Sequence, residues 1–163
     1  RFGSIRLTID DIKYDITTLR KERAYSDSRH PNNIEFVKEL DVDVKRRDFS
    51  INAMYLDSDL KLIDYVNGED DLNNHILRMV GDPNVRLQED PLRILRAFRF
   101  VLTYNVEMNE ELKIAIRNNI SLIEKLNPEK VKQDLKKIKS EDKNKIQNLF
   151  NEFGIQYLLN VID

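Results

Sequence analysis

The sequence predicts an α+β protein with antiparallel strands and short helices in its first part and helices alone in its second part. Two observations predict this fold class. Apolar and polar residues alternate between residues 2 and 19, as in a half-buried β-hairpin. After Pro83 the apolar residues recur at helical spacing to the end of the chain. We therefore place a boundary near residues 81–83 and expect two parts, 1–83 and 84–163.

Composition narrows the possible functions. The chain has 163 residues, of which 40% are hydrophobic and 34% charged, and this is enough for a real core. Its net charge of −2 gives no global attraction to nucleic acid, so any such binding must come from local patches. Without cysteine there are no disulfides and no thiolate metal site, and two histidines are too few for a histidine-rich one.

Three features of the chain bear on location and completeness. No apolar run is long enough to span a membrane, and the first residues are not a secretory signal, so we expect a cytoplasmic protein with no membrane partner. The chain does not begin with Met and opens inside an apparent strand. We therefore expect that it is a fragment and that an N-terminal segment precedes it.

The first expected element is the hairpin, with strands at 2–9 and 12–19 joined by a turn at Asp10 and Asp11. Asp15 stands in the middle of the second strand, although aspartate is a poor strand former. Exposure at a sheet edge would explain it, and so would a carboxylate that faces a metal ion or a base.

The rest of the first part is expected to contain shorter elements. Residues 20–33 are polar and irregular and predict a loop. The D-x-D at Asp41 and Asp43 could bind a metal, but acids at a helix start usually cap it, so we interpret the pair as a cap. We expect strands at 54–56 and 60–64, a short helix at 69–75 and a strand at 76–80.

Residues 45–53 combine three cations with an acid, an aromatic residue and an amide. In a helical turn, Asp48 and Asn52 would share one face, and Phe49 and Ala53 would anchor another. Such a pair could bind a ribose hydroxyl while Arg47 reaches a phosphate or a base. The alternative is a charged helix end with a structural Asp–Asn hydrogen bond.

The helix expected from residue 90 onward carries the most unusual pattern. Asp90 can cap it, and Pro91 suits its first turn. One face is apolar, while Asp90, Arg93, Arg96 and Arg99 follow one another in steps of three around the other side. Arginine is permanently charged and forked, which suits phosphate oxygens and base edges. The alternative is an amphipathic helix with a basic outer stripe.

Four further helical segments complete the second part, at 84–88, 110–126, 128–138 and 142–162. Five lysines make the segment at 128–138 and the residue after it strongly basic, but acids and amides interrupt them and aromatic residues are few. We interpret this as a solvated face rather than an RNA surface.

These segments together resemble the class II tRNA nucleotidyltransferase and poly(A) polymerase family, which includes the CCA-adding enzymes. Residues 46–53 read R-R-D-F-S-I-N-A and resemble the family's R-R-D-F-T-I-N-A. Residues 89–93 read E-D-P-L-R and resemble the E-D-x-x-R of its neck. Residues 63–83 look like the segment that closes its head, and residues 14–20 with the loop after them look like its E-V-T-T-F-R strand.

The resemblance implies a fold and a set of roles. The fold would be the C-terminal part of a nucleotidyltransferase head, followed by a helical neck and body. Arg47, Asp90, Arg93, Arg96 and Arg99 would bind the incoming CTP or ATP. Within this set, Asp90 and Arg93 would form the template that reads the Watson–Crick edges of cytosine and adenine. Asp48 and Asn52 would lie near the ribose.

The family implies a reaction as well. It would add CMP and AMP to the 3′ end of tRNA, or of another RNA, with Mg²⁺. The family's metal-binding carboxylates lie in an N-terminal G-[GS]…D-x-D motif, which this sequence lacks. We therefore expect Mg²⁺ to be bound mainly by residues outside this chain, no metal ligands within it, and no independent catalysis. Asp15 is the candidate catalytic acid, at a position where the family usually has Glu.

Three alternatives remain open from the sequence. The first is poly(A) or A-only addition on the same scaffold, which short motifs separate poorly from CCA addition. The second is a non-catalytic module that binds nucleotide or RNA. The third is a helical interaction domain with no nucleotide role, which requires that the ladder of Asp90 and the arginines be incidental.

Overall fold

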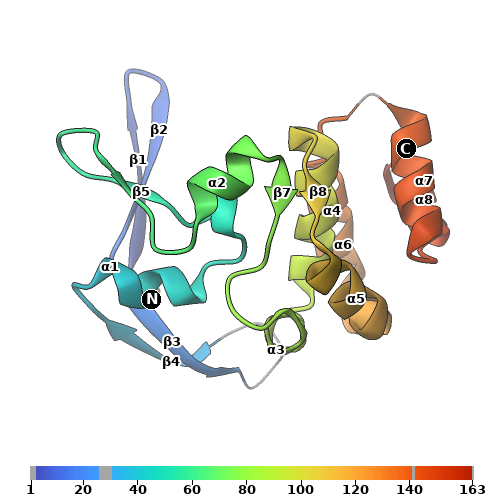
Figure 1. Cartoon of the computed structure of the whole chain (residues 1–163), viewed down its shortest axis with the longest axis horizontal. Coiled ribbons are helices and arrows are strands. Elements are labelled where there is room, and N and C mark those ends of the chain that lie inside the picture. The colour runs from blue at the N-terminus through green and yellow to red at the C-terminus, as the bar shows by residue number, and fades with distance from the viewer. Residues whose placement is uncertain (1–2, 26–30, 141, 163) are drawn as a thin grey trace.

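The computed structural model describes residues 3–25, 31–140 and 142–162. A strand-rich part and a helical part lie side by side, with α4 near the middle of the helical part (Figure 1). Residues 26–30, in the loop that resembles the family's, fall outside the described residues. The predicted α+β class is confirmed, since helices and small two-stranded sheets account for the regular structure.

Within the described residues the strands form four pairs. Their bounds are β1 Ser4–Ile9, β2 Ile12–Thr17, β3 Arg20–Tyr25, β4 Pro31–Phe36, β5 Tyr55–Leu56, β6 Leu62–Ile63, β7 Ile76–Leu77 and β8 Glu107–Met108. The α-helices are α1 Leu40–Asp43, α2 Gly68–Asn73, α3 Pro83–Glu89, α4 Leu92–Tyr104, α5 Glu110–Asn119, α6 Pro128–Leu135, α7 Lys143–Glu152 and α8 Leu159–Ile162. The 3₁₀ helices are η1 Val44–Arg46, η2 Ser50–Asn52, η3 Ile120–Lys125 and η4 Gln156–Leu158.

The predicted first hairpin is confirmed as the antiparallel pair β1–β2. Its turn residues Asp10 and Asp11 both have positive φ, at 49° and 62°, as a tight two-residue hairpin turn requires. The hairpin projects from the rest of the chain (Figure 1), and every residue of both strands is exposed.

The predicted loop at 20–33 is wrong at both ends. Strands β3 and β4 pair antiparallel there, with Arg20 opposite Phe36. Their sequence is polar and lacks clear alternation, so periodicity gave no strand signal. Backbone hydrogen bonding between the strands, rather than a buried apolar face, defines this pair.

The segment 44–53 forms two short 3₁₀ turns rather than one helical turn. The chain is extended at Arg47, with ψ 163°, and again at Phe49. This break lets Phe49 form a bridge with Met79, while the amide of Val80 donates to the carbonyl of Asp48 at 2.9 Å. The segment 44–53 is therefore hydrogen-bonded to the extended residues that follow β7.

Helix α4 lies at the centre of the main core. Its apolar face is buried as predicted, and so are Ala97 and Phe100 on its other sides. Phe98 packs against Phe150 and Phe153, with ring centroids 5.9 and 5.2 Å apart. Phe100 packs against Phe49 at 5.2 Å, so the same core reaches the first part of the chain.

One strand lies where helices alone were expected. β8 pairs parallel with β7, and the chain between them carries α3 and α4. The pairing crosses the boundary expected at residues 81–83, as does the Phe49–Phe100 contact. The division into 1–83 and 84–163 stays a prediction.

Two of the expected helical segments, 110–126 and 142–162, are divided into shorter helices. Helix α5 passes into η3 at Ile120, and the segment expected at 142–162 divides into α7, η4 and α8. Gly154, with φ +70°, stands at the break after α7, in a backbone conformation that favours glycine. In α6, Val131 and Leu135 are buried, whereas most lysines of that region are exposed, as expected of a solvated face.

Candidate functional site

The three arginines of α4 point to three different partners. Three residues advance a helix by about 300°, so each step of the ladder rotates by about 60°. Arg93 contacts residues of α3, Arg96 contacts Asp48, and Arg99 contacts Asp134 of α6 at 3.4 Å. Of these, Arg96 is the one that joins the helix to the R-R-D-F segment.

The Asp48–Arg96 ion pair is the central contact of the candidate site. Arg96 Nε donates to Asp48 Oδ2 at 2.7 Å, and its Nη2 also contacts that oxygen. The Asp48 side chain is 8% exposed and that of Arg96 33%. Burial acts to raise the pKa of Asp48, but the charge and hydrogen bonds of Arg96 outweigh it, so the pKa lies below its usual value.

Asn52 completes the hydrogen bonding of Asp48. Its Nδ2 donates to Asp48 Oδ1 at 3.2 Å, and the Phe49 amide donates to the same oxygen at 2.9 Å. Phe49 is fully buried, so it anchors the segment while the exposed amide of Asn52 faces outward. The predicted Asp–Asn pair is thus formed, although two turns separated by extended residues bring it together.

Arg93 is the most buried arginine of α4, with a side chain 7% exposed. Its Nη1 donates to the carbonyl of Arg86 at 2.6 Å and to Glu89 at 3.2 Å. Glu89 also pairs with Arg86, whose Nη2 donates to the carbonyls of Arg46 and Arg47 at 2.8 and 3.1 Å. The alternative interpretation of α4, a basic outer stripe, therefore does not hold for Arg93, because its side chain is buried against α3.

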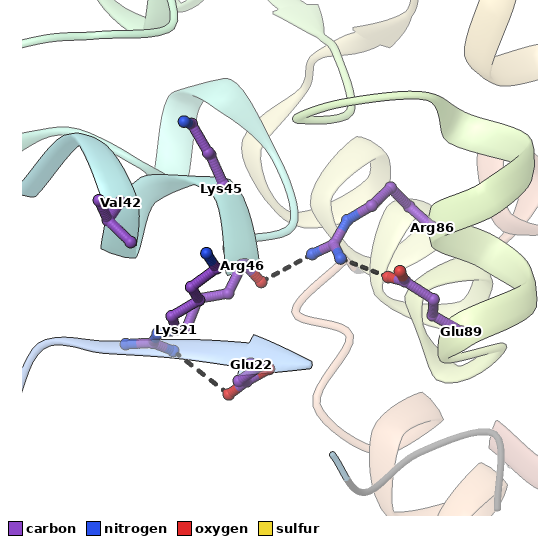
Figure 2. A pocket seen from close by; sticks show the side chains of 7 residues that line it. All are labelled: Lys21, Glu22, Val42, Lys45, Arg46, Arg86 and Glu89. Atoms are coloured by element: carbon purple, nitrogen blue, oxygen red, sulfur yellow. Dashed lines mark hydrogen bonds and ion pairs between the residues drawn. The ribbon is translucent and has the colours of Figure 1, made fainter. Parts of the chain in front are cut away.

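A pocket of about 180 Å³ lies where β3, η1 and α3 meet, and Figure 2 shows Arg86 there between the carbonyl of Arg46 and Glu89. Its lining is Lys21, Glu22, Val42, Lys45, Arg46, Arg86 and Glu89. It borders the R-R-D-F segment and the E-D-x-x-R segment, but the residues predicted to bind nucleotide do not line it. Sequence reasoning gave Arg86 no role, because neither motif includes it.

Asp90 lies between α3 and α4, where its backbone is extended. Its carboxylate accepts from the Leu92 amide at 3.2 Å, so the predicted capping contact is present. Arg93 lies in the first turn of α4, and its amide donates to the Asp90 carbonyl at 3.0 Å. Asp90 and Arg93, the residues predicted to form the template, therefore lie together at the start of α4.

Arg47 directly follows η1 in the R-R-D-F segment. Its Nε donates to Asp43 Oδ2 at 3.1 Å, and its guanidinium lies 5.5 Å from the centre of the Tyr55 ring. Asp43 is fully buried, and the sequence signal that could have identified it is the pair of arginines three and four residues later. Its interpretation as a cap is wrong, because its side chain makes no capping bond.

Asp15 lies on the projecting hairpin, away from the other predicted residues (Figure 1). Arg6 donates to both of its oxygens, at 2.6 and 2.8 Å. That hydrogen bond holds the pKa of Asp15 below its usual range. Its catalytic role stays a prediction.

Within residues 3–25, 31–140 and 142–162, no three histidine or acidic side chains converge to hold a metal ion. These residues alone therefore do not fit a magnesium site, and we derive no metal-dependent step from them. None of the described helices combines the length and apolarity needed to cross a membrane.

The chain was compared with known protein families and sequences. The poly A polymerase head domain pattern matches residues 1–78. The CCA-adding enzyme of Lactobacillus helveticus is 41% identical over 138 residues, which is 85% of this chain and 35% of that enzyme. That of Streptococcus gordonii is 43% identical over 129 residues, 79% of this chain and 32% of the enzyme. The chain spans about a third of the length of these curated relatives.

Solved structures agree. The Bacillus stearothermophilus CCA-adding enzyme in complex with CTP superposes with a TM-score of 0.82 at 27% identity, over 94% of this chain and 37% of that one. A tRNA nucleotidyltransferase complexed with a primer tRNA and an incoming ATP analog gives 0.76 at 28% identity, over 99% and 45%. Over residues 1–78 the chain therefore belongs to the poly A polymerase head domain family, and over most of its length it is similar to CCA-adding enzymes.

Proposed function

We propose that the protein carrying this chain is a tRNA nucleotidyltransferase of the CCA-adding type. It transfers CMP and AMP from CTP and ATP to an RNA 3′ end in the cytoplasm, with Mg²⁺, and this chain supplies nucleotide selection. The observation that supports the proposal most is the Asp48–Arg96 ion pair. It joins the R-R-D-F segment to the helix that follows Asp90, so residues 48 positions apart share one site.

In this proposal Asp90 and Arg93 read the base. A carboxylate accepts a hydrogen bond from an exocyclic amino group, while a guanidinium donates to ring nitrogen and carbonyl acceptors. Cytosine and adenine carry an amino group where uracil and guanine carry a carbonyl. Contacts of Arg93 with Glu89 and the Arg86 carbonyl limit its rotamers, which favours selection by a fixed donor.

The remaining predicted residues hold the rest of the nucleotide. Asp48 and Asn52 offer an acceptor and an amide to the ribose hydroxyls, and Arg47, Arg96 and Arg99 supply positive charge for the phosphates. Because Arg96 already pairs with Asp48, a bound nucleotide shares or replaces that contact. Asp15 stays the candidate catalytic acid of this chain. The metal-binding carboxylates would come from outside the described residues.

A calorimetric titration of the full chain with CTP, ATP, GTP and UTP in Mg²⁺ tests nucleotide selection. We expect CTP and ATP to bind, and Asp90→Ala to weaken both about 5- to 150-fold, the worth of one base-reading pair. Asp59→Ala, in the exposed β5–β6 turn, is the control. Equal binding of all four nucleotides, silence toward all four, or full selectivity in Arg93→Ala would each refute this assignment.

Extension products separate the family's reactions. The protein carrying this chain should add CMP and AMP to tRNA that lacks its 3′ end. Repeated AMP addition to oligo(A) would identify a poly(A) polymerase instead, and addition of AMP alone to tRNA that ends in CC would identify an A-adding enzyme.

A further inference from the structure

Asp43 is a fully buried carboxylate that receives four hydrogen bonds. Its Oδ1 accepts from the Arg20 amide at 2.9 Å and from Arg46 Nε at 2.7 Å. Its Oδ2 accepts from Arg47 Nε at 3.1 Å and from the Tyr55 hydroxyl at 2.9 Å. The two oxygens thus serve different partners, and the Oδ2 side serves Arg47 and Tyr55.

The charges in this cluster fix which groups donate. Burial acts to raise the pKa of Asp43, but the bonds from Arg20, Arg46 and Tyr55 outweigh it, so the pKa is lowered and the carboxylate stays ionised. Burial, and then the bond to Asp43, raise the pKa of Tyr55 to about 12, so its hydroxyl stays protonated. Tyr55 is therefore a permanent donor near neutral pH.

The cluster holds Arg47 by one edge. Nε is engaged by Asp43, and the ring of Tyr55 lies 5.5 Å from the guanidinium carbon. The two terminal nitrogens lie outside the bond to Asp43, and the side chain is 34% exposed. A guanidinium fixed at Nε and supported by an aromatic ring presents its terminal nitrogens in one orientation.

We propose that Asp43 is a positioning residue for nucleotide binding, which acts by orienting Arg47 toward the anionic part of the incoming nucleotide. This rests on the proposed function, which places Arg47 among the binding residues. Asp43 also ties the start of β3 to this segment through the Arg20 amide. The orientation of Arg47 is therefore built into the packing of β3 against η1.

The substitution Asp43→Asn isolates the contact to Arg47. An asparagine with its oxygen at the Oδ1 position still accepts from Arg20 and Arg46. Its amide group then faces Arg47 Nε, and two donors oppose each other, while the Tyr55 hydroxyl can turn to accept. Asp41→Asn, on the exposed face of α1, is the matched control.

The first measurement is ¹⁵N NMR of the arginine Nε–H groups in the full chain without ligand. We expect exchange of the Arg47 Nε proton with water to accelerate about tenfold or more in Asp43→Asn, and to stay unchanged in Asp41→Asn. An unchanged Arg47 signal in Asp43→Asn would overturn the inference, whatever the chain binds.

The second measurement is a double-mutant cycle on CTP affinity, with folding of each variant verified by its thermal transition. Asp43→Asn should raise the Kd for CTP about tenfold in the parent chain, but change it less than about twofold in Arg47→Ala. Equal losses in both backgrounds would show a general structural role and refute positioning through Arg47. If the parent chain binds no nucleotide, the proposed function fails and the inference fails with it.

Discussion

Loss of the Arg96 side chain should expose how much the buried Asp48 carboxylate depends on it. The Asp48 side chain is only 8% exposed. In Arg96→Ala, the hydrogen bonds that remain to this carboxylate are those from the Phe49 amide and from Asn52. Removal of one partner of a buried pair costs about 3–5 kcal/mol. Arg96 is one-third exposed and water can replace part of it, so we expect the low end, about 3 kcal/mol at neutral pH.

The stability lost in Arg96→Ala should also depend on pH. In the parent chain the pKa of Asp48 is lowered by folding, so its contribution is present above about pH 4 and is lost as the pH falls through the folded value. Without Arg96, burial dominates and raises the pKa, so the folded variant binds a proton more readily than the unfolded chain. The penalty of Arg96→Ala should therefore shrink between about pH 7 and about pH 4.5.

Urea unfolding, followed by far-ultraviolet circular dichroism at several pH values, measures both effects. Arg117→Ala is the control, because the Arg117–Glu152 pair is about half exposed at both ends and should contribute less than about 1 kcal/mol. A penalty for Arg96→Ala no larger than that of the control, or one that does not change with pH, would refute the argument.

Three other contacts give predictions of the same kind. Asp71→Ala removes the acceptor shared by Ser50, at 2.6 Å, and Arg78, and should lower the free energy of unfolding by about 2–4 kcal/mol in urea. Gly68→Ala would place Cβ 2.3 Å from the Ser50 carbonyl oxygen, and should cost about 2–3 kcal/mol, seen as a lower Tm. Tyr55 should ionise near pH 12 in a spectrophotometric titration, so the stability it contributes is fully present below about pH 10 and is lost as the pH rises through about 12.

Each of these has a control or a contrary outcome. Asp70→Ala changes an exposed acid on the same helix as Asp71 and should be close to neutral, so equal losses would contradict the buried-network argument. A Gly68→Ala protein with the parent Tm would show that the Ser50 carbonyl moves freely. A titration unchanged by Tyr55→Phe above pH 11 or so would show that this hydroxyl is not the late-ionising one.

Local periodicity was enough to predict the elements with a clear pattern. The β1–β2 hairpin follows from alternation and its turn, and α4 follows from the spacing of its apolar residues. Strands β3 and β4 lack that signal because their residues are polar, and their order comes from pairing with each other. The extended residues between η1 and η2 were also missed, because the bridge from Phe49 to Met79, rather than helix propensity, determines the backbone there.

The candidate site was predictable in its residues but not in its contacts. The motifs identified Asp48 and Arg96 separately, yet their pairing spans 48 positions, and no local pattern predicts it. Asp43 was interpreted as a cap because acids near helix starts usually are, whereas burial and two following arginines make it an acceptor for both. The sequence left open whether Arg93 lies on an outer basic stripe, and only the packing of α3 shows that it is buried.

The parallel pairing of β7 with β8 closes the intervening chain into a loop. The amides of Glu107 and Asn109, which follow α4, donate to the carbonyls of His75 and Leu77, which precede it, at 2.7 and 3.1 Å. A protease cut between Gly81 and Pro83 would therefore not release two pieces. The nicked halves should co-elute and melt as one unit, because the β7–β8 hydrogen bonds and the Phe49–Phe100 contact join the chain on both sides of the cut.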